Sequence, residues 1–293
     1  MSDCTVDYLS PEIMDRMKWI STLSITRGDI SKIYLKPDLL TLTAQESKTV
    51  EIVIDYGTNN NSLTELEIVS NYLNALPANI NQLKSLSLLN LKNNAIQYVN
   101  FSDFNGMDNL TEINLSSNKL YAVACDRKII LDKLETLDLS GNFLIELDFN
   151  NWQFSALRTL SVESNNLKFI MNFDETSFPM LKAFQYSDNA WDCRWRNAFE
   201  PTMEIIDTNI RSQYDEYYGN SQTFKCAKYT QLSASRYRQL NLTTIDDAQF
   251  KFDNPEELEE QLRTIVEDST NHAAEIGLLK ETVTAQKNQL TNY

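Results

Sequence analysis

The 293-residue sequence is poor in histidine, cysteine, glycine and proline, with one, four, six and six of each. Its single histidine, His272, lies near the C-terminus. The preceding residues therefore lack the imidazole that a Ser-His-Asp or Cys-His catalytic device and a histidine zinc site require. No glycine-rich phosphate loop is present either. We therefore expect a protein that is not an enzyme and that binds no metal or cofactor.

Basic residues and long apolar runs are also scarce. The chain has 26 Lys and Arg against 41 Asp and Glu, a formal net charge of −15 and a pI near 4.5. Nucleic-acid binding needs a concentrated basic face, so no nucleic-acid partner is expected. No apolar run reaches about 18 residues, so no membrane span is predicted. The first residues lack the apolar core of a signal peptide, so any secretion signal has been removed or replaced.

What the sequence does contain is the frame Leu-x-x-Leu-x-Leu-x-x-Asn-x-Leu, with apolar replacements, in six copies. The copies occupy residues 63–73, 86–96, 110–120, 134–144, 157–167 and 181–191. Their asparagines, spaced by 23 or 24 residues, are Asn71, Asn94, Asn118, Asn142, Asn165 and Asn189. Frame and spacing resemble those of the leucine-rich repeat.

Strand geometry explains what such a frame does. Leu137 and Leu139 are two residues apart and point to one side of a strand, whereas Asp138 points to the other. One short strand cannot bury its apolar side alone, but stacked copies share a core. We therefore predict an α/β leucine-rich-repeat horseshoe solenoid with a parallel sheet on its concave face. The asparagines are expected to turn inward and to satisfy backbone groups of the turn and of the neighbouring repeat.

The pattern divides the chain into four parts. Residues 1–19 are predicted to be an N-terminal cap, in which Trp19 and other apolar side chains cover the open end of the core. Residues 20–188 are predicted to be repeats that are clear from residue 63. The earlier units are of uncertain register, with residues 50–54 forming a strand. Residues 189–253 are predicted to form a C-terminal cap and residues 254–293 a coiled-coil helix.

The four cysteines are assigned by position. Three or more repeats separate Cys4 from Cys125, which places them roughly 15 Å apart at about 4.8 Å per strand. A disulfide needs Cα atoms within about 7 Å. We therefore predict one bridge, between Cys193 and Cys226, which bracket the end of the repeats. Cys4 and Cys125 are then free, or paired to a partner chain or to segments outside this sequence.

Five Asn-x-Ser/Thr sequences are candidate sites of N-glycosylation. They are Asn60, Asn100, Asn109, Asn114 and Asn241. Asn114 is expected in the middle of a strand on the concave face, where a glycan would obstruct that face.

The outward strand positions form the candidate binding surface, because they are polar and mostly acidic on a rigid support. Such a surface suits a protein partner with basic or hydrogen-bonding groups. The alternative is that these positions are polar only to keep the protein soluble. The candidate residues are Glu65, Glu67, Asn90, Glu112, Asn114, Glu135, Asp138, Arg158, Glu163 and Gln185.

The last 40 residues carry a heptad pattern with glutamates in the first turn after Pro255. We predict a coiled coil with a second chain, as a homodimer or a heterodimer. The alternative is a helix that folds back on the repeats. The apolar stripe comprises Leu258, Leu262, Ile265, Ile276, Leu279, Val283 and Leu290.

The sequence from Asn189 through Trp191 to Cys193, followed by Cys226, resembles the C-terminal cap of extracellular leucine-rich-repeat proteins. Together with the trailing helix, it is similar to the mosquito leucine-rich-repeat immune proteins. This resemblance implies a secreted haemolymph protein that pairs through its coil and cysteines. It also implies that the protein holds a complement-like thioester protein for attack on pathogens. This chain departs from that family because it has no cysteine after Cys226.

Two other functions remain open. The chain is alternatively the ectodomain of an adhesion or signalling receptor, whose parent chain continues to a membrane span. It is otherwise an intracellular scaffold or a microbial effector, in which the cysteines are reduced.

Overall fold

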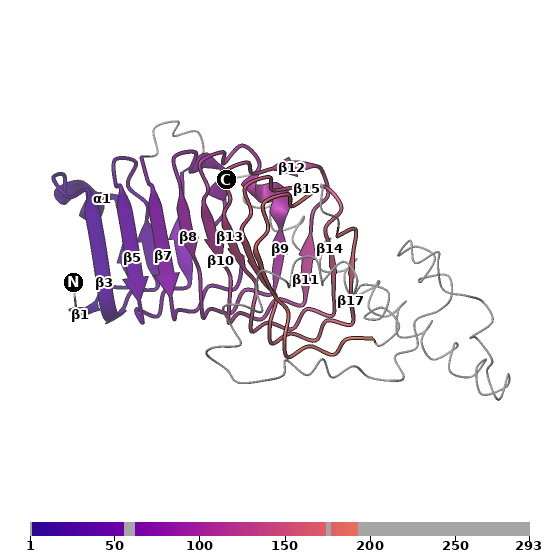
Figure 1. Ribbon diagram of the computed structural model, residues 1–293. Coiled ribbons are helices and arrows are strands. Elements are labelled where there is room, and N and C mark those ends of the chain that lie inside the picture. The colour runs from indigo at the N-terminus through magenta and orange to yellow at the C-terminus, as the bar shows by residue number, and fades with distance from the viewer. Residues whose placement is uncertain (1, 56–61, 174–176, 193–293) are drawn as a thin grey trace, which may run out of the picture. The chain divides into compact units, whose positions relative to one another are not determined.

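The computed structural model describes residues 2–55, 62–173 and 177–192 as a solenoid of parallel strands (Figure 1). The main sheet has nine strands in the order β1-β3-β5-β7-β8-β10-β13-β16-β18. These strands are β1 (Ser2–Thr5), β3 (Thr22–Asp29), β5 (Thr41–Gln45), β7 (Glu65–Val69), β8 (Leu88–Asn90), β10 (Glu112–Asn114), β13 (Thr136–Asp138), β16 (Thr159–Ser161) and β18 (Ala183–Gln185). This arrangement confirms the predicted parallel-sheet solenoid.

Short strands on the return path of each turn form four small parallel sheets, β2-β4-β6, β9-β11, β12-β15 and β14-β17. Their strands are β2 (Tyr8–Leu9), β4 (Lys32–Tyr34), β6 (Glu51–Val53), β9 (Tyr98–Asn100), β11 (Ala122–Ala124), β12 (Ile129–Ile130), β14 (Glu146–Asp148), β15 (Trp152–Gln153) and β17 (Phe169–Met171). The described helices are α1 (Pro11–Arg16) and the 3₁₀ turns η1 (Ile80–Gln82) and η2 (Phe101–Phe104).

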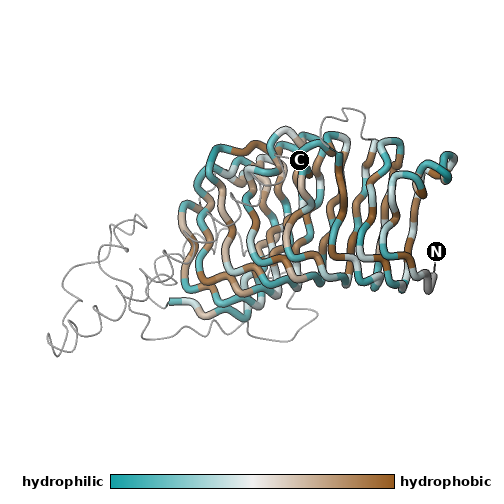
Figure 2. The backbone as a smooth tube through the Cα atoms, turned by 180° about the vertical axis from the view of Figure 1, so that it is seen from behind, coloured by the Kyte–Doolittle hydropathy of each residue, from teal (hydrophilic) through white to brown (hydrophobic). Residues whose placement is uncertain are grey.

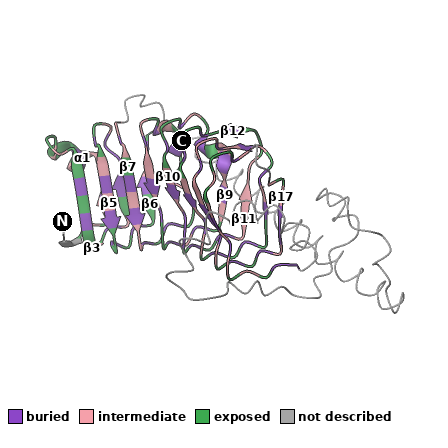
Figure 3. Cartoon of the chain, viewed as in Figure 1, coloured by how far each residue is buried: buried purple, intermediate pink, exposed green. Residues whose placement is uncertain are grey.

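Alternation along the strands builds the core. In β13, Leu137 is fully buried between the half-buried Thr136 and Asp138, and the same inward column is buried in every strand from β3 to β18. Figure 2 shows hydrophobic residues returning in each turn, and Figure 3 shows buried and less buried residues alternating along the main-sheet strands. Apolar surface removed from water contributes about 25 cal/mol per Å². The stacked inward column is therefore the main source of stability.

The inward asparagine ladder is confirmed. The Nδ2 atom of Asn142 donates to the carbonyl oxygens of Leu115 and Leu139 at 3.1 and 3.0 Å, and its Oδ1 atom accepts from Leu120 N at 3.0 Å. Each asparagine follows a residue in the left-handed region, with φ between 52° and 64°. These preceding residues are Ser70, Asn93, Ser117, Gly141, Ser164 and Asp188. Only Gly141 adopts this conformation without steric cost.

A further repeat lies before residue 63, where the pattern alone leaves the register uncertain. Leu42 and Ala44 pair with Leu66 and Ile68, which places Ser47 at the asparagine position. Ser47 is fully buried, and both its backbone N and its Oγ donate to Asn71 Oδ1 at 3.0 Å. The strand predicted within residues 50–54 is β6, which belongs to a small sheet and not to the main sheet.

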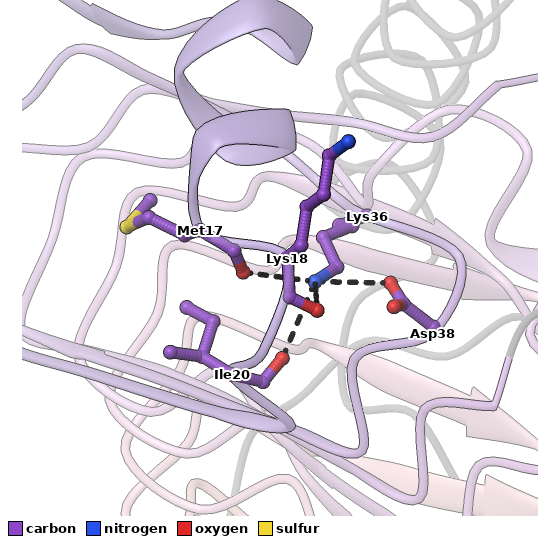
Figure 4. Close-up of polar contacts among 5 residues, drawn as sticks. All are labelled: Met17, Lys18, Ile20, Lys36 and Asp38. Carbon is purple, nitrogen blue, oxygen red and sulfur yellow. Dashed lines mark hydrogen bonds and ion pairs between the residues drawn. The ribbon is translucent and has the colours of Figure 1, made fainter.

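The N-terminal segment differs from the expected cap in two ways. β1 pairs with β3, so the main sheet already includes residues before position 20. Trp19 does not cover the core, since its side chain is 96% exposed, and Met14 of α1 is fully buried instead. The Nζ atom of Lys36 donates to backbone oxygens on both sides of Trp19 and fixes the loop before β3 (Figure 4).

Residues 193–253 of the predicted C-terminal cap and the coiled-coil segment 254–293 lie outside the described residues. The predicted Cys193 to Cys226 bridge and the apolar stripe from Leu258 to Leu290 lie there as well, so these assignments stay predictions.

Candidate protein-binding surface

Strand register brings five of the candidate residues into one column on the outer face of the main sheet. The column begins with Ser24 and Thr43, and Ser161 is its second-last residue. The five candidates in it are Glu67, Asn90, Asn114, Asp138 and Gln185. These predicted outward positions therefore form a continuous row across adjacent strands, which we term the central column.

A second column carries two more candidates around an apolar residue. Leu88 pairs with Glu65 on one side and with Glu112 on the other. Neighbouring strands lie about 4.8 Å apart, so the two glutamates flank Leu88 at roughly twice that distance from each other. Leu88 is half-buried. It points outward, and the repeat frame does not require a leucine at its position.

The amide and carboxylate oxygens of three central residues are used by the fold. Asn114 Oδ1 accepts from the backbone N of Ser116 at 3.0 Å and from its Oγ at 2.7 Å. Asp138 Oδ1 accepts from Ser140 N at 2.9 Å, and Asn90 Oδ1 accepts from Lys92 N at 3.2 Å. Such local bonds satisfy the turn that follows each strand. These side chains therefore have a structural task besides any binding role.

The three glutamates of β7 and β10 have more freedom. Glu67 accepts from Asn90 Nδ2 at 3.2 Å, and Glu65 makes a long contact of 3.4 Å with Thr41 Oγ1. None of Glu65, Glu67 and Glu112 forms an ion pair within the described part of the chain. Together with Leu88 they form what we term the acidic patch, a negatively charged surface on a rigid sheet.

The remaining candidates lie outside the strands. Glu135 and Arg158 immediately precede β13 and β16, and they pair with each other at 3.4 Å between Oε2 and Nε. Glu163 follows β16 and accepts from the hydroxyl of Ser187. These three residues were predicted at outward strand positions, but the structure places them at the two margins of the central column because the strands are only three residues long.

Three of the five candidate glycosylation sites are described, and they differ in exposure. Asn109 is exposed, Asn114 is half-buried in β10, and Asn100 is half-buried in β9. Asn100 donates to Asp126 Oδ2 at 2.6 Å and accepts from Ser102 N at 3.0 Å. Asn109 is the most exposed of the three, and its Nδ2 atom donates to Lys84 O at 3.0 Å. Asn60 and Asn241 lie outside the described residues.

Cys125 has a free thiol in the described structure. Its Sγ donates to the backbone oxygen of Arg127 at 3.2 Å. Burial raises the pKa of the Cys125 thiol, which disfavours the reactive thiolate at neutral pH. Only the backbone of Cys4 is described, and it pairs with Gly28 of β3.

Two features are absent from residues 2–55, 62–173 and 177–192. No group of three or more His, Cys, Asp and Glu side chains is arranged there to hold a metal ion. No helix in the same residues combines the length and apolar character needed to cross a membrane.

Comparison with protein families and curated proteins finds the same repeat. Two family models described as leucine rich repeat match residues 61–120 and 133–154. Leucine-rich repeat-containing protein 66 of Homo sapiens is 35% identical over 85 residues, 29% of this chain and 10% of that protein. Adenylate cyclase of Schizosaccharomyces pombe is 26% identical over 157 residues, 51% of this chain and 9% of that protein. Because the chain spans a tenth or less of each, these matches concern the repeats and not the activity.

Two similar solved structures contain LRIM1. The LRIM1 leucine-rich-repeat domain has a TM-score of 0.55 and 20% identity, over 75% of this chain and 66% of that chain. The LRIM1/APL1C complex has a TM-score of 0.58 and 17% identity, over 98% of this chain and 64% of that chain. At such identities the likeness concerns the fold. The stacked strands, the asparagine ladder and these matches together show that the described part of the chain consists of leucine-rich repeats and has the leucine-rich-repeat fold.

Proposed function

We propose that this protein is a secreted, non-enzymatic scaffold that binds another protein through the acidic patch and serves innate immune recognition. The observation that carries the proposal is the set of three glutamates, without ion pairs among the described residues, around Leu88 on a rigid sheet. The similar fold of LRIM1, solved as a complex with APL1C, supports a role in assembly. A complement-like thioester protein is the partner class that the sequence resemblance implies.

The surface suits a basic partner on physical grounds. Like charges that reach solvent and lack intramolecular ion pairs produce a negative potential, which speeds encounter with a basic surface and disfavours acidic competitors. Leu88 adds an apolar contact for the aliphatic stem of a lysine or arginine. The strands are held by neighbours on both sides, so little order has to be gained on binding.

Charge reversal of Glu65, Glu67 and Glu112 to lysine should weaken binding of a purified complement-like thioester protein by about tenfold to a hundredfold, mostly through slower association. The measurement is surface plasmon resonance at two salt concentrations, since the wild-type affinity should fall with salt. The matched control reverses three other exposed acidic residues, namely Glu12, Asp15 and Asp108. Equal affinities for wild type, variant and control would remove the acidic patch from the proposal.

Secretion makes a separate prediction. The protein isolated from its source without reduction should yield a tryptic peptide pair linked by Cys193 and Cys226, whereas Cys125 should take up an alkylating reagent after unfolding. Removal of N-glycans should convert Asn109 to aspartate with the matching mass change. Light scattering should report two chains through the coiled coil, either identical or different. Recovery of both Cys193 and Cys226 as thiols would favour the intracellular alternative.

A further inference from the structure

The turns that leave the main sheet form a lateral surface with its own pattern. In the five repeats with ladder residues Asn71 to Asn165, the residues one and three positions after the asparagine are exposed or half-buried, and the residue between them is buried. After Asn142, Phe143 is 54% exposed, Leu144 is fully buried and Ile145 is 42% exposed. Backbone hydrogen bonds tie these turns together, since Phe143 N donates to Leu120 O at 2.8 Å. The lateral surface is therefore as regular as the sheet.

Because the repeats are equivalent, they act as internal references for one another. The turn after Asn142 departs from the others by presenting two large apolar side chains at the outward positions. The five corresponding pairs, in chain order, are Tyr72 and Asn74, Ala95 and Gln97, Lys119 and Tyr121, Phe143 and Ile145, and Asn166 and Lys168. Solubility imposes the same demand on each pair, so the departure at one turn indicates a contact specific to that turn.

Two lysines border the apolar pair. Lys119 occupies the position of Phe143 in the preceding turn, and Lys168 occupies the position of Ile145 in the next turn, where its backbone N donates to Ile145 O at 2.9 Å. Turns joined in this way lie about 5 Å apart. Neither lysine forms an ion pair within the described ranges. The acidic residue nearest in sequence to Ile145 is Glu146, the first residue of β14.

An aromatic residue elsewhere on the same surface shows the contrast. Tyr72 stands at the position equivalent to Phe143 and is 60% exposed. The lysine in its preceding turn, Lys48, is already paired with Asp29 at 2.9 Å. Asn74 takes the place that Ile145 has in the other turn. Tyr72 therefore lacks both the second apolar side chain and the free cation.

We infer that the lateral patch formed by Lys119, Tyr121, Phe143, Ile145 and Lys168 docks an amphipathic acidic segment of a partner protein. Apolar side chains of that segment cover Phe143 and Ile145, and its carboxylates meet the two lysines. Aromatic and long aliphatic side chains with a polar rim are the usual composition of such contacts. Charge complementarity selects the partner: the lysines favour carboxylates, whereas an anionic lipid surface is repelled by a chain of net charge −15. This surface is distinct from the acidic patch and does not depend on it.

The probe is a synthetic helical peptide with leucines in heptad order and glutamates at its other positions, titrated into the 293-residue chain by fluorescence anisotropy. The double variant Phe143→Ser with Ile145→Ser should bind about tenfold more weakly. The double variant Lys119→Gln with Lys168→Gln should also bind more weakly and should lose the salt dependence of binding. Tyr72→Ser, the matched control, should bind as wild type does.

Three outcomes would overturn the inference. The first is no binding of the peptide to the wild-type chain, and the second is equal loss of affinity in Tyr72→Ser. The third is a change of sedimentation coefficient in the Phe143 and Ile145 variant, which would assign the patch to a second copy of this chain. Because all substituted side chains are exposed or half-buried, unchanged circular dichroism melting serves as the check on folding. Loss of binding to the acidic patch leaves these outcomes unaffected.

Discussion

Replacement of Asn118 by alanine should lower the free energy of unfolding by about 3 kcal/mol. Asn118 is 5% exposed, and its Oδ1 atom accepts from Ile96 N at 3.1 Å. Its Nδ2 atom donates to the carbonyl oxygens of Leu91, Leu115 and Ser116 at 2.9, 3.0 and 3.3 Å. The alanine methyl group replaces none of these bonds, and water does not reach the buried amide of Ile96. A fall of roughly 10 °C in Tm should accompany the loss for a domain of this size.

Urea unfolding followed by circular dichroism measures the effect. Asn166→Ala is the control, because Asn166 is exposed and adjoins the ladder residue Asn165. Its substitution should change the free energy of unfolding by less than about 0.5 kcal/mol. Asn118→Asp keeps the acceptor but places a buried carboxylate oxygen against the carbonyl oxygens of Leu91, Leu115 and Ser116, so it should destabilise the protein at least as much as alanine does. A ladder variant that unfolds at the same urea concentration as the Asn166 control would contradict the structural role of the asparagine.

Lys36→Met should lower the free energy of unfolding by about 2 kcal/mol. Lys36 is 5% exposed, and its Nζ atom donates to the backbone oxygens of Met17, Lys18 and Ile20 at 3.1, 3.2 and 3.3 Å (Figure 4). It also pairs with Asp38 at 3.2 Å, but that carboxylate is 65% exposed and contributes less. Methionine keeps the aliphatic packing and removes the cation that orders three carbonyl groups.

Limited trypsin digestion adds a local measurement. Lys18 lies in the loop that the ammonium holds, so cleavage after Lys18 should become faster in Lys36→Met than in wild type. Lys32→Met is the control, since Lys32 pairs with Glu51 at 2.7 Å with both side chains about half exposed. It should cost at most about 1 kcal/mol and leave cleavage after Lys18 unchanged. Equal digestion rates for the two variants would show that Lys36 does not hold the loop.

The sequence predicted the repeats because their pattern follows directly from strand geometry. Leucines two residues apart must share a face, and an asparagine at a fixed step must reach the same backbone groups in each turn. The central column through Glu67, Asn90 and Asp138 followed from the same alternation. The register of the repeat that contains Leu42 stayed uncertain because Ser47 replaces the asparagine, and a serine carries no such signal. Only its hydrogen bonds to Asn71 show that the position is equivalent.

Trp19 shows a different reason for a wrong prediction. An apolar residue beside a core is expected to be buried, because burial of its surface lowers the free energy. Here the backbone on both sides of Trp19 is fixed by one ammonium group, and the indole is directed into solvent. The spacing of Lys36 from residues 17–20 in the sequence does not predict its hydrogen bonds to their backbone oxygens.

The sequence by itself determined the solenoid, its parallel strands, its ladder and the polar character of the outer face. The tertiary structure decided which polar side chains on that face are already used: Asn114 and Asp138 hold turn amides, and Glu135 is paired with Arg158, whereas Glu65 and Glu112 flank Leu88 without ion pairs in the described chain. The physical reason is that periodicity fixes the direction in which a side chain points. Hydrogen bonds and ion pairs depend instead on distances of a few ångströms between residues that the sequence places 2 to about 24 positions apart.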